Sequence, residues 1–224
     1  METDYAPRVK PYKGLPMEGI LATWYAKLTA KTSNEFRGDA SRIATLLQTG
    51  GRVLEIAPGP GYLAIELAKL GSYKITGLDI SHAFVRIAKE NAARAGVAVD
   101  FNQGDAAALP LASGTADFII CRAAFKNFGA PLGALREMYR VLQPGGRALI
   151  MDTRNDVSDT EIDAQVEKLS LGPLNSFVCR IIFKRMLRKR AYSKEDFVRM
   201  LAATPFGAGE IVKVPFGLEA WLTK

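Results

Sequence analysis

The sequence has few of the residues that form disulfides or metal sites. Its 224 residues include two cysteines, Cys121 and Cys179, which lie far apart without metal-ligand spacing, and a single histidine, His82. We therefore expect free thiols, a reducing compartment, and neither a zinc site nor another metal centre.

Long apolar segments are also lacking. Residues 1–16 contain no apolar signal-peptide core, and no uninterrupted apolar stretch of about 18 residues occurs elsewhere. These absences argue against secretion and against a membrane span, and they predict a cytoplasmic protein.

Acidic residues are outnumbered by basic ones, which gives a net charge of +7. Such a balance suits nucleic acid or an anionic membrane, but it also occurs on enzymes that bind anionic metabolites, so the charge alone does not decide the partner. With 48% hydrophobic residues, the chain can bury a core of ordinary size, which favours a single domain with appendages.

The chain is organised around the stretch 52–68, RVLEIAPGPGYLAIELA. Val53, Leu54 and Ile56 predict a buried strand, and the stretch from Gly61 onward predicts a helix. Gly59 and Gly61 lack the Cβ that would hold a ligand away from the backbone, and the helix directs its free N–H groups toward the same place. The turn therefore predicts a ligand site.

Strand and helix patterns then alternate, which indicates βαβ units, a mostly parallel sheet and helices on both faces, in a Rossmann-like α/β fold with seven strands. Ser81 is expected to cap one helix and Gly96 to end it. The expected strands are 52–56, 74–78, 98–102, 116–121, 147–151, 210–214 and 218–223, the last two forming an antiparallel hairpin; the expected helices between them are 61–70, 81–95 and 131–142, with a break at 144–146.

Four segments make up this single domain. Residues 1–48 are an arm (1–16) followed by cap helices, the second over 39–48; residues 49–157 are the ligand-binding core; residues 158–203 are a helical insertion or lid; and residues 204–224 are the closing hairpin.

The identity of the ligand is open from the turn alone. Gly59 to Ala64 fits the G-x-G-x-x-G/A pattern of dinucleotide sites, and Asp79 follows at a suitable spacing. Glu55 would face a pyrophosphate unfavourably but could accept hydrogen bonds from a cationic amino group. Asp105 adds an acceptor at the end of the third strand. Acidic groups thus end three successive strands at the edge where open α/β sheets bind ligands.

The ordered motifs VLEIAPGPG, GLDIS, GDAAALPL, ADFIICRAAF and REMYRVLQPGG resemble those of class I S-adenosylmethionine-dependent methyltransferases, and in particular the small-molecule branch that includes the ubiquinone and menaquinone C-methyltransferases. The resemblance implies S-adenosyl-L-methionine as cofactor, with Glu55, Gly59 and Gly61 around its methionine portion, Asp79 at the ribose, and Asp105 at the adenine. The chain departs from the family at Ala57, where glycine is usual. The full set of implied cofactor-binding residues is Glu55, Ala57, Gly59, Gly61, Asp79, Ile80, Gly104, Asp105, Ala106 and Cys121.

The acceptor is expected to be a small molecule that takes the methyl group by in-line displacement. Its contacts are predicted from the N-terminal helix and from the loops after the fourth and fifth strands, although packing and surface solvation explain the same side chains: Trp24, Tyr25, Arg122, Phe125, Asn127 and Asp152. His82 is interpreted as a surface residue and not as a base, so no catalytic residue is assigned.

Segment 177–190, FVCRIIFKRMLRKR, predicts a basic amphipathic helix. Its main interpretation is a lid whose apolar face packs over the substrate pocket, and its alternative is a peripheral membrane contact. The rival functions are an RNA or protein methyltransferase, a non-catalytic cofactor-binding or scaffold protein of the same fold, and a nicotinamide dehydrogenase. No specific nucleic-acid partner is expected, and the oligomeric state is not predicted.

Overall fold

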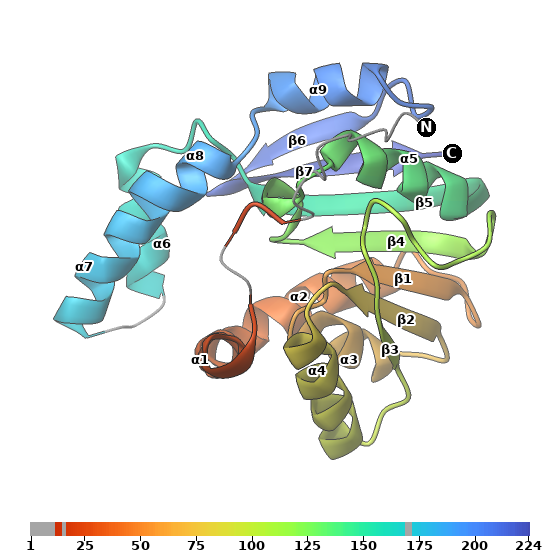
Figure 1. The fold of residues 1–224 in the computed structure, drawn as a ribbon, viewed down its shortest axis with the longest axis horizontal. Coiled ribbons are helices and arrows are strands. Elements are labelled where there is room, and N and C mark those ends of the chain that lie inside the picture. Colours follow the sequence, from red (N-terminus) through yellow and green to blue (C-terminus); the bar gives the residue numbers. More distant parts are fainter. Residues whose placement is uncertain (1–11, 15–16, 169–171) are drawn as a thin grey trace, which may run out of the picture.

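The computed structural model describes residues 12–14, 17–168 and 172–224 and contains one seven-stranded sheet in the order β3-β2-β1-β4-β5-β7-β6 (Figure 1). Strands β1 to β5 run parallel, and β7 is antiparallel to both of its neighbours. This arrangement confirms the predicted fold class. The strands are β1 (Arg52–Ile56), β2 (Lys74–Asp79), β3 (Asp100–Gln103), β4 (Ala116–Arg122), β5 (Leu142–Thr153), β6 (Glu210–Val214) and β7 (Gly217–Thr223).

Helices cover both faces of the sheet because the central strands β1, β4 and β5 alternate their apolar side chains between two hydrophobic clusters. One cluster packs beneath α5 (Pro131–Val141) and α9 (Lys194–Ala202). The other packs beneath α2 (Ser33–Ala44), α3 (Tyr62–Ala68) and α4 (His82–Ala95). The predicted caps of α4 are confirmed, since the Ser81 hydroxyl accepts a hydrogen bond from the Phe84 amide and Gly96 has a left-handed backbone.

Two boundaries differ from the sequence prediction by five residues or more. Helix α2 begins at Ser33 and not at Asp39, because Phe36 packs on Tyr62 with 5.5 Å between ring centroids and draws the preceding turn onto the core. Strand β5 begins at Leu142, so the expected break at 144–146 is an irregularity within the strand, where its pairing with β4 shifts register.

The remaining helices lie beyond the carboxyl ends of the parallel strands, on the side to which the β4 arrow points (Figure 1). They are α1 (Gly19–Thr29), the 3-10 turn η1 (Ala30–Thr32), and the insertion made of α6 (Asp159–Lys168), α7 (Pro173–Ile182), the π-helical turn η3 (Phe183–Leu187) and α8 (Arg188–Arg190). A further 3-10 turn, η2 (Phe125–Asn127), follows β4. No helix in the described ranges is long and apolar enough to cross a membrane.

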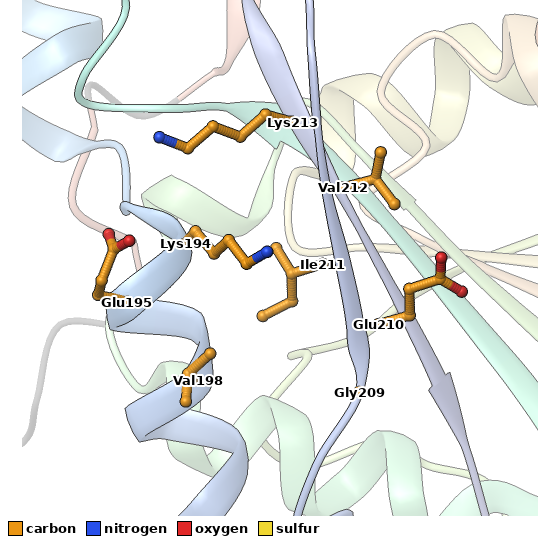
Figure 2. Close-up of a pocket in the computed structure, with 8 residues that line it drawn as sticks. All are labelled: Lys194, Glu195, Val198, Gly209, Glu210, Ile211, Val212 and Lys213. Carbon is orange, nitrogen blue, oxygen red and sulfur yellow. The ribbon is translucent and has the colours of Figure 1, made fainter.

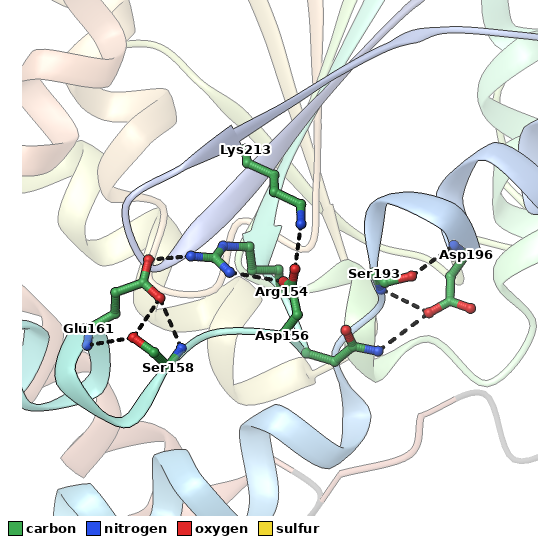
Figure 3. A network of polar contacts seen from close by, with 8 residues as sticks. Arg154, Asp156, Ser158, Glu161, Ser193, Asp196 and Lys213 are labelled. Carbon is green, nitrogen blue, oxygen red and sulfur yellow. Dashed lines mark hydrogen bonds and ion pairs between the residues drawn. The ribbon is translucent and has the colours of Figure 1, made fainter.

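A polar network fixes the insertion to the sheet (Figure 3). Arg154, at the end of β5, forms ion pairs with Asp156 and with Glu161 of α6. Asp156 also binds Lys213 of β6. A capping box between Ser193 and Asp196 starts α9 nearby. The bases of α6 and α9 are therefore held on the same edge of the sheet.

Candidate cofactor site

The glycine turn between β1 and α3 forms the floor of the candidate site. Gly61 has φ +80, and a Cβ there would approach the Phe101 ring to 2.6 Å, so this glycine permits close packing of the helix onto the sheet. Gly59 has φ +55, and a Cβ there would meet nothing within 4 Å. The backbone at Gly59 therefore faces open space in which a ligand can lie.

Ala57 adopts φ +55 in the same turn. A left-handed backbone costs an L-residue with a Cβ roughly 1–2 kcal/mol, a cost that glycine does not have. The departure from the family pattern at this position thus keeps the turn's conformation and adds backbone strain to it.

Glu55 is buried with 3% of its surface exposed, and its Oε2 atom has no hydrogen-bond partner among the described residues. Burial raises its pKa from 4.5 to about 8, although the Ala64 amide at the N-terminus of α3 donates to the carboxylate. A buried carboxylate oxygen beside the turn, lacking a donor, is suited to a ligand that brings a positive charge or an N–H group.

Asp79, at the end of β2, holds the turn in place. Its Oδ2 accepts from the Gly59 amide at 2.9 Å and its Oδ1 accepts from the Ser81 amide at 2.9 Å. Burial raises the pKa of this carboxyl group despite the two hydrogen bonds. The sequence predicted contact with ribose, and the structure adds a second role, since Asp79 ties Gly59 to β2.

The end of β3 completes the row of acids. The Gly104 amide donates to the Asp79 carbonyl at 3.0 Å, and the Asp105 Oδ1 accepts from the Ala107 amide at 2.9 Å. Asp105, Ile80 and Ala106 are half-buried at the same edge of the sheet. Glu55, Asp79 and Asp105 therefore lie at or near the carboxyl ends of three neighbouring strands, β1, β2 and β3, as the sequence predicted.

Cys121 is the last residue but one of β4, and only its backbone lies near the carboxyl edge of the sheet. Its side chain is fully buried in the cluster beneath α5 and α9, where burial raises the pKa of the thiol strongly. Because alternate residues of a strand face opposite sides of the sheet, Cys121 points away from the side of Glu55 and is a core residue.

The loop after β4 is held by a buried ion pair. The Lys126 Nζ lies 2.7 Å from the Asp152 Oδ1 and donates to the Ala123 carbonyl at 2.6 Å, and the side chains of the ion pair are 5% and 2% exposed. The Asp152 Oδ2 accepts from the Lys126 amide. Asp152 was predicted to contact the acceptor, but its carboxylate is occupied in fixing this loop. Lys126 was missed because an isolated lysine in a loop gives no sign of burial in the sequence.

Three further predicted acceptor residues are also engaged elsewhere. Phe125 is fully buried and packs on Phe197, so it belongs to the core instead of an acceptor-stacking surface. Arg122 binds Asp39 of α2 at 2.8 Å. Tyr25 packs on Phe84 of α4.

Two predicted acceptor residues are not engaged in this way, Trp24 because it is exposed and Asn127 because one of its side-chain atoms has no partner among the described residues. Trp24 is 54% exposed on α1. The Asn127 Oδ1 is buried and has no hydrogen-bond partner in the described part of the chain. His82 is exposed at the start of α4.

The part of the N-terminal arm that the structure describes lies against this loop. Tyr12 forms an isolated antiparallel bridge with Phe128, and the Lys13 amide donates to the Asn127 carbonyl at 2.8 Å. The Lys13 Nζ also donates to the Tyr192 hydroxyl at 2.7 Å. The remainder of the predicted arm, residues 1–11 and 15–16, lies outside the described residues.

Tyr12 was not predicted as a site residue. Burial raises the pKa of its hydroxyl group, and the nearby Tyr25, Asp79 and Asp152 contribute to the rise. These neighbours come from α1 and from the ends of β2 and β5, so Tyr12 lies between the cofactor edge and the acceptor loops. An aromatic residue in a proline-rich arm was the only sequence signal.

Two hollows lie near or beyond this edge. A cavity of about 520 Å³ borders Arg122, Asp152 and the β6–β7 turn, and paired charges such as Arg42 and Glu219 line it. A shallow groove of about 850 Å³ runs between α9 and β6, where Figure 2 shows Lys194, Glu195, Glu210 and Lys213 around it. Three strands separate β6 from the glycine turn after β1, so this groove is not part of the candidate site.

Comparison with known proteins agrees with this geometry. A family model described as a methyltransferase domain matches residues 54–150. A demethylmenaquinone methyltransferase from Deinococcus radiodurans is 33% identical over 114 residues, which cover 50% of this chain and 47% of the relative. A ubiquinone/menaquinone biosynthesis C-methyltransferase from Bdellovibrio bacteriovorus is 34% identical over 106 residues, which cover 47% of this chain and 45% of the relative. The chain thus matches about half the length of these curated relatives.

A solved structure extends the likeness across the fold. A proposed S-adenosyl-L-methionine-dependent methyltransferase from Methanococcus maripaludis aligns with a TM-score of 0.76 and 25% identity, covering 91% of this chain and 92% of that one. The glycine turn and the three acids lie within residues 54–150, which the family model matches. Residues 54–150 therefore match a methyltransferase domain, and the comparisons confirm the resemblance to class I S-adenosyl-L-methionine-dependent methyltransferases predicted from the motifs.

Proposed function

We propose that the protein transfers a methyl group from S-adenosyl-L-methionine to a small-molecule acceptor. The observation that carries the proposal is Glu55, whose buried Oε2 has no donor among the described residues and lies beside a glycine turn that opens onto free space. A nicotinamide dinucleotide would bring phosphate charges toward this carboxylate, whereas an amino-acid nucleoside brings an ammonium group.

The residues fit this cofactor. Glu55 would accept from its ammonium group, Asp79 would keep Gly59 in the conformation that admits it, and Asp105 would accept from its adenine amine. When bound, S-adenosyl-L-methionine supplies an activated methyl group on a sulfonium. The chain's contribution is then to hold the acceptor in line with that methyl group, and such positioning supplies much of the rate in reactions of this kind.

The acceptor would lie on the side of the edge bounded by Tyr12, Tyr25 and Asn127. Tyr12, which is only partly buried, offers a ring face for a flat molecule. The Asn127 Oδ1, which has no hydrogen-bond partner among the described residues, offers an acceptor for one of that molecule's hydroxyl groups. The cavity beside Arg122 suits an apolar molecule less well, because seven of its seventeen lining residues are charged. The curated relatives are named for quinone substrates, and we propose an aromatic or quinol-like acceptor on these grounds.

The proposal is tested by incubating the protein with methyl-labelled S-adenosyl-L-methionine and a panel of acceptors. The panel contains a short-chain naphthoquinol, simple phenols, total RNA and a mixed protein extract. Label in the naphthoquinol or the phenols is the expected result. Label in RNA or protein alone would contradict the proposal and favour an RNA or protein methyltransferase. Cofactor binding without methyl transfer to any acceptor would favour a non-catalytic role.

A further inference from the structure

The outward side of α7 is apolar and exposed. Leu174 is 76% exposed, Phe177 59%, Val178 45% and Ile181 42%, and no α7 residue is buried. Four large apolar side chains on one helix face exceed the scattered single residues that soluble surfaces normally carry. We call these four residues the outer α7 face.

The opposite side of the same helix provides its attachment to the protein. Cys179 packs, with Phe183 just beyond the helix, on the small cluster formed by Val157, Ile162 and Val166. The Arg180 Nε binds the Asp163 Oδ1 of α6 at 2.9 Å. Because α7 already packs on α6 through this inner side, its outer face is exposed in the part of the chain that the structure describes. This differs from the predicted lid, whose apolar face would cover the substrate pocket.

Basic residues continue the outer face toward the C-terminus. Beyond Ile181, the π-helical turn and α8 carry Arg185, Arg188 and Lys189, of which Arg185 and Lys189 are exposed. Arg188 is bound to Asp159 of α6. In the described ranges, Arg185 and Lys189 have no acidic partner within ion-pair distance. The surface is therefore apolar in its first half and positively charged in its second.

This combination selects one class of partner. An RNA or an acidic protein segment would use the charges but leave Leu174 and Phe177 in water, and a second copy of this chain would bring positive charge against positive charge. A bilayer with anionic lipids takes apolar side chains between its acyl chains and attracts basic side chains at its headgroups. We infer that the outer α7 face, with Arg185 and Lys189, docks on an anionic membrane surface.

The position of the surface is consistent with a role in acceptor supply. The insertion lies beyond the carboxyl edge of the sheet, as does α1, whose Ile20 and Trp24 are 89% and 54% exposed (Figure 1). Docking would thus bring the edge that carries the candidate site toward the bilayer. The docking itself requires no methyl transfer, so its test is independent of the proposed function.

The test is co-sedimentation of the full chain with phosphatidylcholine vesicles that do or do not contain phosphatidylglycerol. We expect binding only when phosphatidylglycerol is present, and release as salt is added. The double variant Leu174→Glu/Phe177→Glu should lose about tenfold or more in affinity, and Arg185→Gln/Lys189→Gln should lose most of its binding to the phosphatidylglycerol vesicles. The matched control is Leu70→Glu/Val198→Glu, which adds the same charges at two residues outside α7 that are 49% and 51% exposed. This control should lose less vesicle affinity than the α7 pair.

A second measurement uses Phe177→Trp, which keeps the face apolar. Its indole fluorescence should shift to shorter wavelength when phosphatidylglycerol vesicles are added. The inference is overturned if the wild-type chain stays in the supernatant, if the α7 pair and the control pair lose binding equally, or if the indole stays in water. Dimerisation that the α7 pair abolishes, without vesicle binding, would assign the face to a second copy and also overturn it.

Discussion

Replacement of Glu55 by glutamine should make the free protein more stable and the cofactor complex weaker. Burial raises the pKa of Glu55 from 4.5 to about 8. The folded protein therefore keeps the proton up to about pH 8, whereas the unfolded chain releases it near pH 4.5. Between these two values the folded state binds more protons, so the free energy of unfolding falls as the pH rises.

The size of this effect follows from the two pKa values. One pKa unit corresponds to about 1.4 kcal/mol, so the step from 4.5 to about 8 corresponds to on the order of 5 kcal/mol of stability lost between those pH values. Glutamine has nearly the same shape and does not ionise. Glu55→Gln should therefore match the wild-type protein near pH 5 and exceed its stability by several kcal/mol above pH 8.

Cofactor binding should respond in the opposite direction. A carboxylate that accepts from an ammonium group contributes about 1.5–3 kcal/mol, so glutamine should weaken binding by roughly 10- to 100-fold. Binding to the wild-type protein below pH 8 should also release the Glu55 proton, and the calorimetric heat should then depend on the buffer's ionisation enthalpy. Glu55→Gln should lose that dependence.

Urea titrations across pH 5 to about 8.5 and calorimetry in two buffers measure both effects. Glu210→Gln is the matched control, because Glu210 is exposed on the edge strand β6. A Glu55→Gln variant with the wild-type pH slope would show that this carboxylate is not held protonated by burial. Unchanged affinity would remove Glu55 from the cofactor site.

Three further experiments, two with variants and one with the native protein, test the surrounding structure. Ala57→Gly should raise the free energy of unfolding by about 0.5–1 kcal/mol, because φ +55 suits glycine, and a loss of stability would show that the Ala57 methyl group packs favourably. Lys126→Met should cost about 3–5 kcal/mol in urea unfolding, since it leaves the Asp152 carboxylate buried without its cation, and a cost below 1 kcal/mol would refute that burial. In the native protein a thiol reagent at pH 8 should modify Cys179 and leave Cys121 unmodified, because Cys121 is fully buried with a strongly raised pKa; equal labelling, read by mass spectrometry, would contradict this.

The elements that depend on a local sequence pattern could be predicted from the sequence. Alternating apolar runs located the parallel strands, Ser81 and Gly96 marked the ends of α4, and the glycine turn identified the carboxyl edge of β1. The three acids could be predicted together because parallel strands place their carboxyl ends at one edge, and each acid stands next to a turn.

The acceptor side could not be predicted in the same way, since it depends on pairings between distant segments. Nothing local indicates that Asp152 meets Lys126, or that Arg122 reaches Asp39 across 83 positions. Tyr12 belongs to an arm without a periodic pattern, and its bridge to Phe128 is a tertiary contact. The sequence predicted that the apolar face of this helix packs over the substrate pocket, whereas the outer α7 face is exposed. An amphipathic pattern identifies an apolar and a polar side of a helix, but it does not show which side the rest of the protein covers.

The central claim is that the glycine turn, with Glu55 beside it, binds S-adenosyl-L-methionine. Calorimetric titration of the intact protein with this cofactor tests it most directly. The account predicts saturable binding at one site per chain, competed by S-adenosyl-L-homocysteine and not by NAD. Absence of binding at cofactor concentrations in the millimolar range, with no rise in melting temperature, would contradict it.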